Sequence, residues 1–67
     1  MPRYFFHVHD DSEIRDHVGI ELAGLGEAKA HANTAVKVAK SLLAGTPFRI
    51  VVTDESTAVV YELAVPD

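Results

Sequence analysis

The chain has 67 residues, ten acidic against six basic side chains, a net charge of −4 and no cysteine. This length allows one small domain, residues 1–67, and the lack of cysteine excludes disulfides, thiolate metal sites and cysteine nucleophiles. No apolar run is long enough to span a membrane, and the N-terminus lacks the pattern of a signal peptide, so we expect a soluble cytoplasmic protein. The negative charge disfavours non-specific binding to nucleic acid.

The first predicted element is a strand from Arg3 to His9, which is rich in aromatic and β-branched side chains. Side chains alternate between the two faces of a strand. Tyr4, Phe6 and Val8 form the more apolar face, and we expect that face to lie under a helix.

A turn and a second strand follow. Asp10, Asp11 and Ser12 are typical turn residues, because their side chains bond to nearby backbone amides. Residues 13–16 begin a second strand, which we expect residues 17–19 to interrupt with a bulge or a bend. Residues 20–22 then lead toward the helix.

The longest predicted element is an amphipathic helix from Leu25 to Ala44, ended by Gly45 and Pro47. Gly24 is only a moderate N-cap. One stripe of this helix is apolar and mostly alanine, so we expect it to lie close against a sheet. The stripe contains Leu25, Ala28, Ala32, Ala35, Val36, Ala39, Leu42 and Leu43.

Two strands are predicted after the helix, Phe48 to Thr53 and Ala58 to Val65. With a two-residue loop, Phe48 would pair with Leu63, Ile50 with Tyr61 and Val52 with Val59 on one face. The same register would place Arg49 opposite Glu62 and Val51 opposite Val60.

The predicted fold class is therefore α+β, with the order β-β-α-β-β and one helix packed across one face of a four-stranded antiparallel sheet. A single helix leaves the other face uncovered, with Phe5, Val51 and Val60 among its apolar side chains. We expect a homodimer, formed either by packing of the two sheet faces or by pairing of edge strands. A monomer with scattered exposed valines is the alternative.

His7 and His9 are candidate metal ligands, because residues i and i+2 of a strand project from the same face. A tight hairpin would bring Asp16 opposite His7 as a third ligand. The competing interpretation is that these are half-exposed histidines on a sheet surface or at a dimer interface.

Lys29, Lys37 and Lys40 form a basic ribbon along one flank of the helix. This ribbon is a candidate site for nucleic acid or an acidic partner, although lysines on a solvated helix flank also serve solubility. The acidic pairs lie in turns, and no serine or threonine has the sequence context of a nucleophile. We therefore expect no enzymatic activity and no cofactor.

Three segments resemble a family of short bacterial proteins catalogued as a domain of unknown function. They are the opening Pro2–Val8, the motif Asp16-x-x-Gly19-x-Glu21-Leu22 before an alanine-rich helix, and the closing motif Val52-x-Asp54-Glu55. The resemblance implies a small stand-alone protein with no established activity, cofactor or partner. The chain departs from the family pattern in its two turns, where Asp11-Ser12 and Ser56-Thr57 replace the usual glycine.

Overall fold

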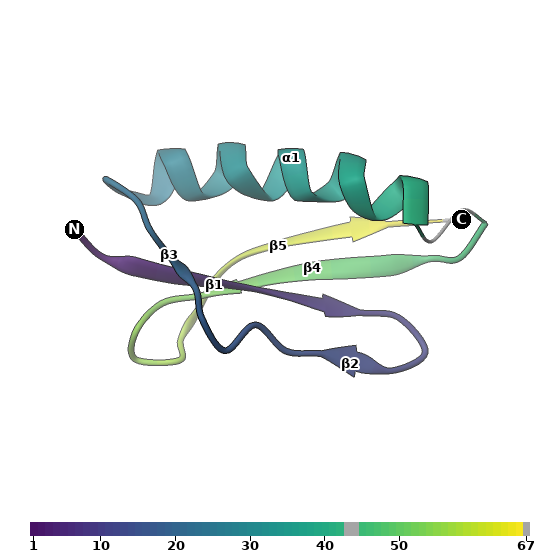
Figure 1. Ribbon diagram of the computed structural model, residues 1–67, viewed down its shortest axis with the longest axis horizontal. Helices are drawn as coiled ribbons and strands as arrows, with labels where there is room; N and C mark the ends of the chain where they lie inside the picture. The colour runs from purple at the N-terminus through teal and green to yellow at the C-terminus, as the bar shows by residue number, and fades with distance from the viewer. Residues whose placement is uncertain (43–44, 67) are drawn as a thin grey trace.

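The computed structural model describes residues 1–42 and 45–66 and consists of one helix and an antiparallel sheet (Figure 1). The elements in chain order are β1 (Arg3–His9), β2 (Glu13–Ile14), β3 (Ile20–Glu21), α1 (Leu25–Leu42), β4 (Phe48–Thr53) and β5 (Val59–Val65). The α+β class and the β-β-α-β-β order are thus confirmed. The last two residues predicted for the helix, Leu43 and Ala44, lie outside the described residues.

The sheet has the order β2-β1-β4-β5, and β3 pairs with β1 on the same edge as β2. The first strand is therefore central, although it is first in the sequence. The predicted second strand is present as two strands of two residues each, so the sheet has five strands rather than four. The turn between them occupies residues 15–19, so the strand ends two residues before the interruption that was predicted at residues 17–19.

The core lies between α1 and the sheet. It contains Ile50 and Val52 of β4, which are almost fully buried, together with two alanines of α1, Ala28 and Ala32, which have no exposed surface. Tyr4 completes it from β1, with Phe6 and Val8 packed against its edge. The predicted orientation of the first strand is therefore confirmed, and small side chains let the helix approach the sheet closely.

Both large side chains at the ends of the predicted helix stripe are less buried than expected. Leu25 is 40% exposed and Leu42 is 78% exposed. The reason is the position of α1, which contacts chiefly β4 and β5 and does not extend across the sheet (Figure 1). The helix begins after Gly24, and the carboxylate of Glu27 accepts a hydrogen bond from the amide of Ala23 at 3.1 Å.

The predicted register of the last hairpin is wrong by two residues. Ile50 pairs with Leu63 and Val52 with Tyr61, and a bulge shifts the register beside Thr53. The loop is longer than two residues because the Asp54 carboxylate accepts hydrogen bonds from the amides of Ser56 and Ala58. Side chains alternate between faces with a period of two, so a shift by two residues leaves the part of β5 that follows the bulge with its side chains on the predicted faces.

Candidate functional site

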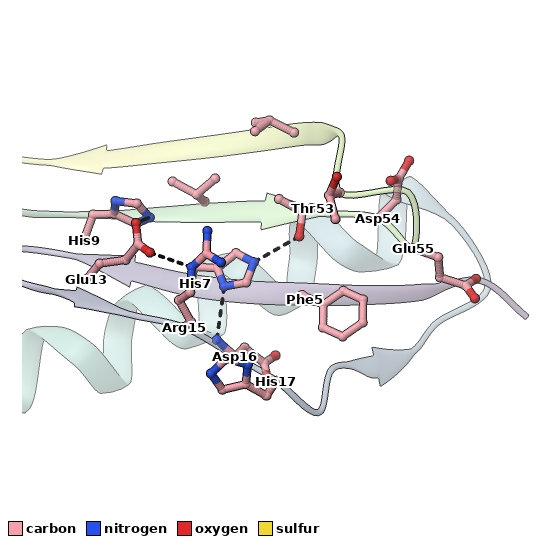
Figure 2. A pocket seen from close by; sticks show the side chains of 13 residues that line it. Phe5, His7, His9, Glu13, Arg15, Asp16, His17, Thr53, Asp54 and Glu55 are labelled. Atoms are coloured by element: carbon pink, nitrogen blue, oxygen red, sulfur yellow. Dashed lines mark hydrogen bonds and ion pairs between the residues drawn. The ribbon is translucent and has the colours of Figure 1, made fainter.

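His7 lies at the centre of a hydrogen-bonded cluster on the open face of the sheet, which is the face opposite α1 (Figure 2). Its Nδ1 accepts a hydrogen bond from the amide of Asp16 at 3.0 Å, and its Nε2 lies 3.0 Å from the hydroxyl of Thr53. Because Nδ1 is an acceptor, the neutral ring carries its proton on Nε2 and donates it to Thr53. Burial, followed by the nearby Arg15, lowers the pKa of His7, which favours this neutral form.

Asp16 connects the turn between β2 and β3 to the central strand. One carboxylate oxygen accepts hydrogen bonds from the amides of Val18 and Gly19, and the other accepts one from the amide of Phe6, at 3.0 to 3.1 Å. Burial alone would raise the pKa of Asp16, but these three amides outweigh it and lower that pKa. The carboxylate is therefore ionised, and it fixes the turn against β1.

Gly19 is required at its position in this turn. Its backbone is left-handed, with φ of +72°, and a Cβ added there would lie 2.8 Å from the ring of Phe5 and 2.9 Å from the carbonyl oxygen of Tyr4. Any side chain would therefore be strained by the backbone and would also meet atoms of β1.

Arg3 connects the turn between β2 and β3 to two other segments. Its guanidinium donates to the carbonyl of Val18 at 2.9 Å and lies 3.3 Å from the carboxylate of Glu21. Its backbone amide donates to Glu55, in the loop between β4 and β5, at 3.2 Å. All three motifs that carried the family resemblance thus meet at this end of the sheet, and their polar groups hold the scaffold together.

The open face carries a hollow of about 470 Å³ beside this cluster (Figure 2). Its lining is mixed, with the aromatic ring of Phe5, the imidazoles of His7 and His9, and carboxylates such as Glu55. Within the described residues, every buried side-chain nitrogen and oxygen already has a hydrogen-bond partner. The hollow therefore presents no unsatisfied buried group that would select a ligand.

The candidate metal ligands are only partly brought together. His7 and His9 line the same hollow, but His9 lies 3.7 Å from the carboxylate of Glu13, and the Asp16 carboxylate is bonded to backbone amides. Over residues 1–42 and 45–66, no three histidine or acidic side chains are grouped closely enough to hold a metal ion. Metal binding at these residues stays a prediction.

The lysine ribbon lies on the exposed flank of α1, on the side of β5. The ammonium of Lys29 is 5.3 Å from the centre of the Tyr61 ring, a cation–π contact, and Lys37 and Lys40 are exposed. Binding of nucleic acid or an acidic partner by this ribbon stays a prediction.

The predicted self-association face is only partly as expected. Phe5 and Val51 both line the hollow on the open face, but Val51 is only 8% exposed. Val60 was expected on the open face, and the structure contradicts this, since Val60 packs against the core under α1. The bulge beside Thr53 is the cause, and it places Val59 on the open face instead.

The two edges of the sheet differ, a feature that the sequence did not reveal because strand order was unknown. One edge is formed by β2 and β3, two short strands separated by the Asp16 turn. The other edge is β5, which runs without interruption for seven residues and, within residues 1–42 and 45–66, pairs only with β4. Its backbone therefore has one side free for pairing.

These features define the class of protein, a small α+β domain whose sheet is covered by one helix and whose opposite face is organised by a histidine–aspartate cluster. A family model described as Domain of unknown function (DUF6894) matches residues 3–66, and the chain belongs to this family. No curated protein and no solved structure gives a significant match. In the part of the chain that the structure describes, no helix is long and apolar enough to cross a membrane.

Proposed function

We propose that this protein is a small cytoplasmic, non-catalytic interaction module that forms a homodimer through antiparallel pairing of its β5 edges. The observation that carries the proposal is the difference between the two edges of the sheet. β5 offers seven consecutive residues with one charged side chain, Glu62, and no proline or lysine. Natural proteins commonly protect such an edge, and a second copy of the same strand is the simplest cover.

The opposite edge supports this choice. There, β2 and β3 contribute two residues each, and the Asp16 turn between them leaves no continuous run of free backbone groups. Short, interrupted strands are a known protection against edge-to-edge pairing. Pairing is thus directed to β5.

The side chains of β5 favour one register. If Leu63 lies on the two-fold axis, Tyr61 faces Val65 of the partner subunit and Glu62 faces Ala64 of the partner subunit. A two-fold axis at Glu62 would instead oppose two carboxylates, which destabilises a strand pair. The Leu63 register is therefore the one that we propose.

This arrangement also brings the two helices together. Because α1 lies over β4 and β5, two copies joined at β5 would hold their helices about 10 Å apart, two strand spacings. Lys29 and Lys40 are eleven residues apart, about three turns, so they share the flank that would face the other helix. Repulsion between the lysines of the two helices opposes association. Because salt screens this repulsion, we expect added salt to lower the dissociation constant of the dimer.

Light scattering over a dilution series tests the proposal, with paired variants at the exposed residue Ala64. Ala64→Glu would place a carboxylate opposite Glu62 twice in the dimer, which costs roughly 0.2–1 kcal/mol per pair, so its dissociation constant should rise about 2- to 30-fold. Ala64→Lys should keep or tighten the dimer.

The proposal would be overturned if the wild-type protein were monomeric at every concentration. It would also be overturned if the two Ala64 variants changed the dissociation constant of the dimer equally. The same series is repeated with zinc and with a chelator. Association that depends on zinc would favour the metal hypothesis for His7 and His9, whose minimum requirement is loss of metal affinity when both are changed to alanine. Pairing through β5 requires a mass that is indifferent to both additions.

A further inference from the structure

We infer that the dimer paired through β5 binds a small multivalent phosphate on its two-fold axis, between the two α1 helices. This inference rests on the proposed function and adds to it a ligand that strengthens association. The phosphate would be bound by the exposed side chains of Lys29 and Lys40 of both subunits, which we call the lysine seam.

The charge of α1 indicates an anion. All three lysines of the sequence lie in α1 with one acidic residue, Glu27, although the whole chain has a net charge of −4. The Glu27 carboxylate already accepts a hydrogen bond from the amide of Ala23. Within residues 1–42 and 45–66, no lysine forms an ion pair with a carboxylate. The lysines of α1 are therefore an uncompensated positive surface on an acidic protein, and this surface attracts anions.

Lys29 and Lys40 lie on the flank of α1 nearest the β5 edge, whereas Lys37 does not. At about 100° per residue, Lys40 lies about 20° around the helix from Lys29, and Lys37 lies about 80° from it. The ammonium of Lys29 is 5.3 Å from the centre of the Tyr61 ring, and Tyr61 belongs to β5. Lys37 is about 140° around the helix from the fully buried Ala32, so it lies on the side away from the sheet.

The proposed register places the two-fold axis midway between Lys29 and Lys40. Leu63, on the axis, is two residues beyond Tyr61, about 7 Å along β5. Figure 1 shows that α1 runs in the same direction as β5, and about 7 Å along a helix is between four and five residues. Because Lys29 lies beside Tyr61, the axis passes beside residues 33–34. The two-fold therefore places Lys29 of each subunit beside Lys40 of the partner subunit.

The space at the seam favours a small ion over a segment of another protein. A helix with its side chains is about 10 Å across, so two helices about 10 Å apart are in contact and admit no further helix or strand between them. Lysine has a long flexible stem, so the four ammonium groups can converge on one compact ion. A phosphate group has about two negative charges near pH 7, whereas a carboxylate has one. Two linked phosphates therefore match the seam better than an acidic side chain does.

The probe is inorganic pyrophosphate, added as its sodium salt to the full chain during light scattering over a dilution series. Sodium chloride at equal ionic strength is the reference, because it provides the same screening of lysine repulsion without a multivalent ion. An ion that binds only the dimer, present at ten times its own dissociation constant, lowers the dissociation constant of the dimer about 11-fold. We expect a decrease of this size relative to chloride, growing with pyrophosphate concentration.

Lys40→Gln is the main variant, because it removes two charges of the seam per dimer. Without pyrophosphate it should lower the dissociation constant of the dimer, since repulsion is reduced, and its response to pyrophosphate should fall below about twofold. Lys37→Gln is the matched control, because it removes the same charge from the same helix but away from the seam. It should keep the full response. A misfolded variant would instead associate less under both conditions, and circular dichroism identifies it.

Equal dissociation constants of the wild-type dimer in pyrophosphate and in chloride would overturn this inference and leave the β5 dimer in place. Equal loss of the response in Lys40→Gln and Lys37→Gln would also overturn it, because the ion would then respond to overall charge. A wild-type protein that stays monomeric with and without pyrophosphate would overturn both proposals. Binding of a single-stranded oligonucleotide without any effect of pyrophosphate would overturn this one and assign the lysines to nucleic acid.

Discussion

Substitution of Gly19 by alanine offers the most direct test of the turn that connects β2 to β3. The added methyl group costs about 1–2 kcal/mol because the backbone at Gly19 is left-handed. Contacts of 2.8 to 2.9 Å with the Phe5 ring and the Tyr4 carbonyl add about 1–3 kcal/mol of overpacking. The expected loss of folding free energy is about 2–5 kcal/mol.

This loss is large for so small a domain. At about 0.05–0.15 kcal/mol per residue, a 67-residue chain has a folding free energy of about 3–10 kcal/mol. Gly19→Ala is therefore expected to bring the protein close to the midpoint of unfolding. Urea denaturation followed by far-ultraviolet circular dichroism measures the change.

Substitutions at two other glycines separate the cost of the left-handed backbone from the cost of the close contacts. Gly45 has φ of +80°, but among the described residues, its chain neighbours apart, no atom lies within 4 Å of an added Cβ. Gly45→Ala should therefore lose only the backbone contribution, about 1 kcal/mol. Gly26 lies in the first turn of α1 with open space around it, so Gly26→Ala should gain up to about 0.5–1 kcal/mol. If Gly19→Ala loses no more stability than Gly45→Ala, the close contact with β1 is not as described.

Three further predictions concern the core, the histidine and the cation–π contact. Ala32→Asp should leave the chain unfolded, since a carboxylate would replace a fully buried methyl group, and circular dichroism would show the loss of helix. Folding lowers the pKa of His7, so the neutral imidazole contributes its full stabilisation above pH 6.5, the ordinary pKa of histidine, and this contribution is lost as the pH falls through the pKa of the folded protein. His7→Gln should therefore make the stability less sensitive to acid, as measured by urea titration at several pH values. Lys29→Ala should cost about 0.5–1 kcal/mol, an effect that Lys37→Ala, with no aromatic contact described, should not reproduce in thermal melts.

The parts of the fold that could be predicted from the sequence depend on local pattern. Alternating apolar side chains located β1, β4 and β5, and the same alternation placed Tyr4 toward the helix. Gly45 and Pro47 signalled the end of the helical segment. These signals are local because side-chain period and chain-breaking residues act within a few positions.

The parts that could not be predicted depend on contacts between distant residues. The central position of β1 is set by pairing with β4, 40 or more residues away, and no local pattern reports it. The exposure of Leu42 follows from where α1 lies on the sheet rather than from its own periodicity. The register of β4 and β5 was wrong because Asp54 supports a wider loop than the assumed two-residue turn.

Asp16 was predicted as a metal ligand, and the structure gives its carboxylate a different set of contacts, with the amides of Phe6, Val18 and Gly19. The spacing Asp16-x-x-Gly19 contains a usable signal, because an aspartate that accepts amides two and three residues later makes a characteristic turn. The additional bond to Phe6 could not be predicted, since it requires the hairpin geometry to be known.

The Asp16 turn also bears on how copies associate, because it keeps the β2–β3 edge interrupted. Asp16→Asn retains the oxygen that accepts two amides of the turn, but it directs an NH₂ group at the amide of Phe6. We expect a loss of about 1–3 kcal/mol and partial release of β2 and β3 from β1.

Release of those strands would expose a second edge, and the protein should then form species larger than a dimer, measured by light scattering over time. Asp54→Asn is the matched control, since a single oxygen of Asp54 accepts the hydrogen bonds of its loop and would be kept. If Asp16→Asn is destabilised but never exceeds the mass of the natural protein, protection of that edge does not depend on the turn.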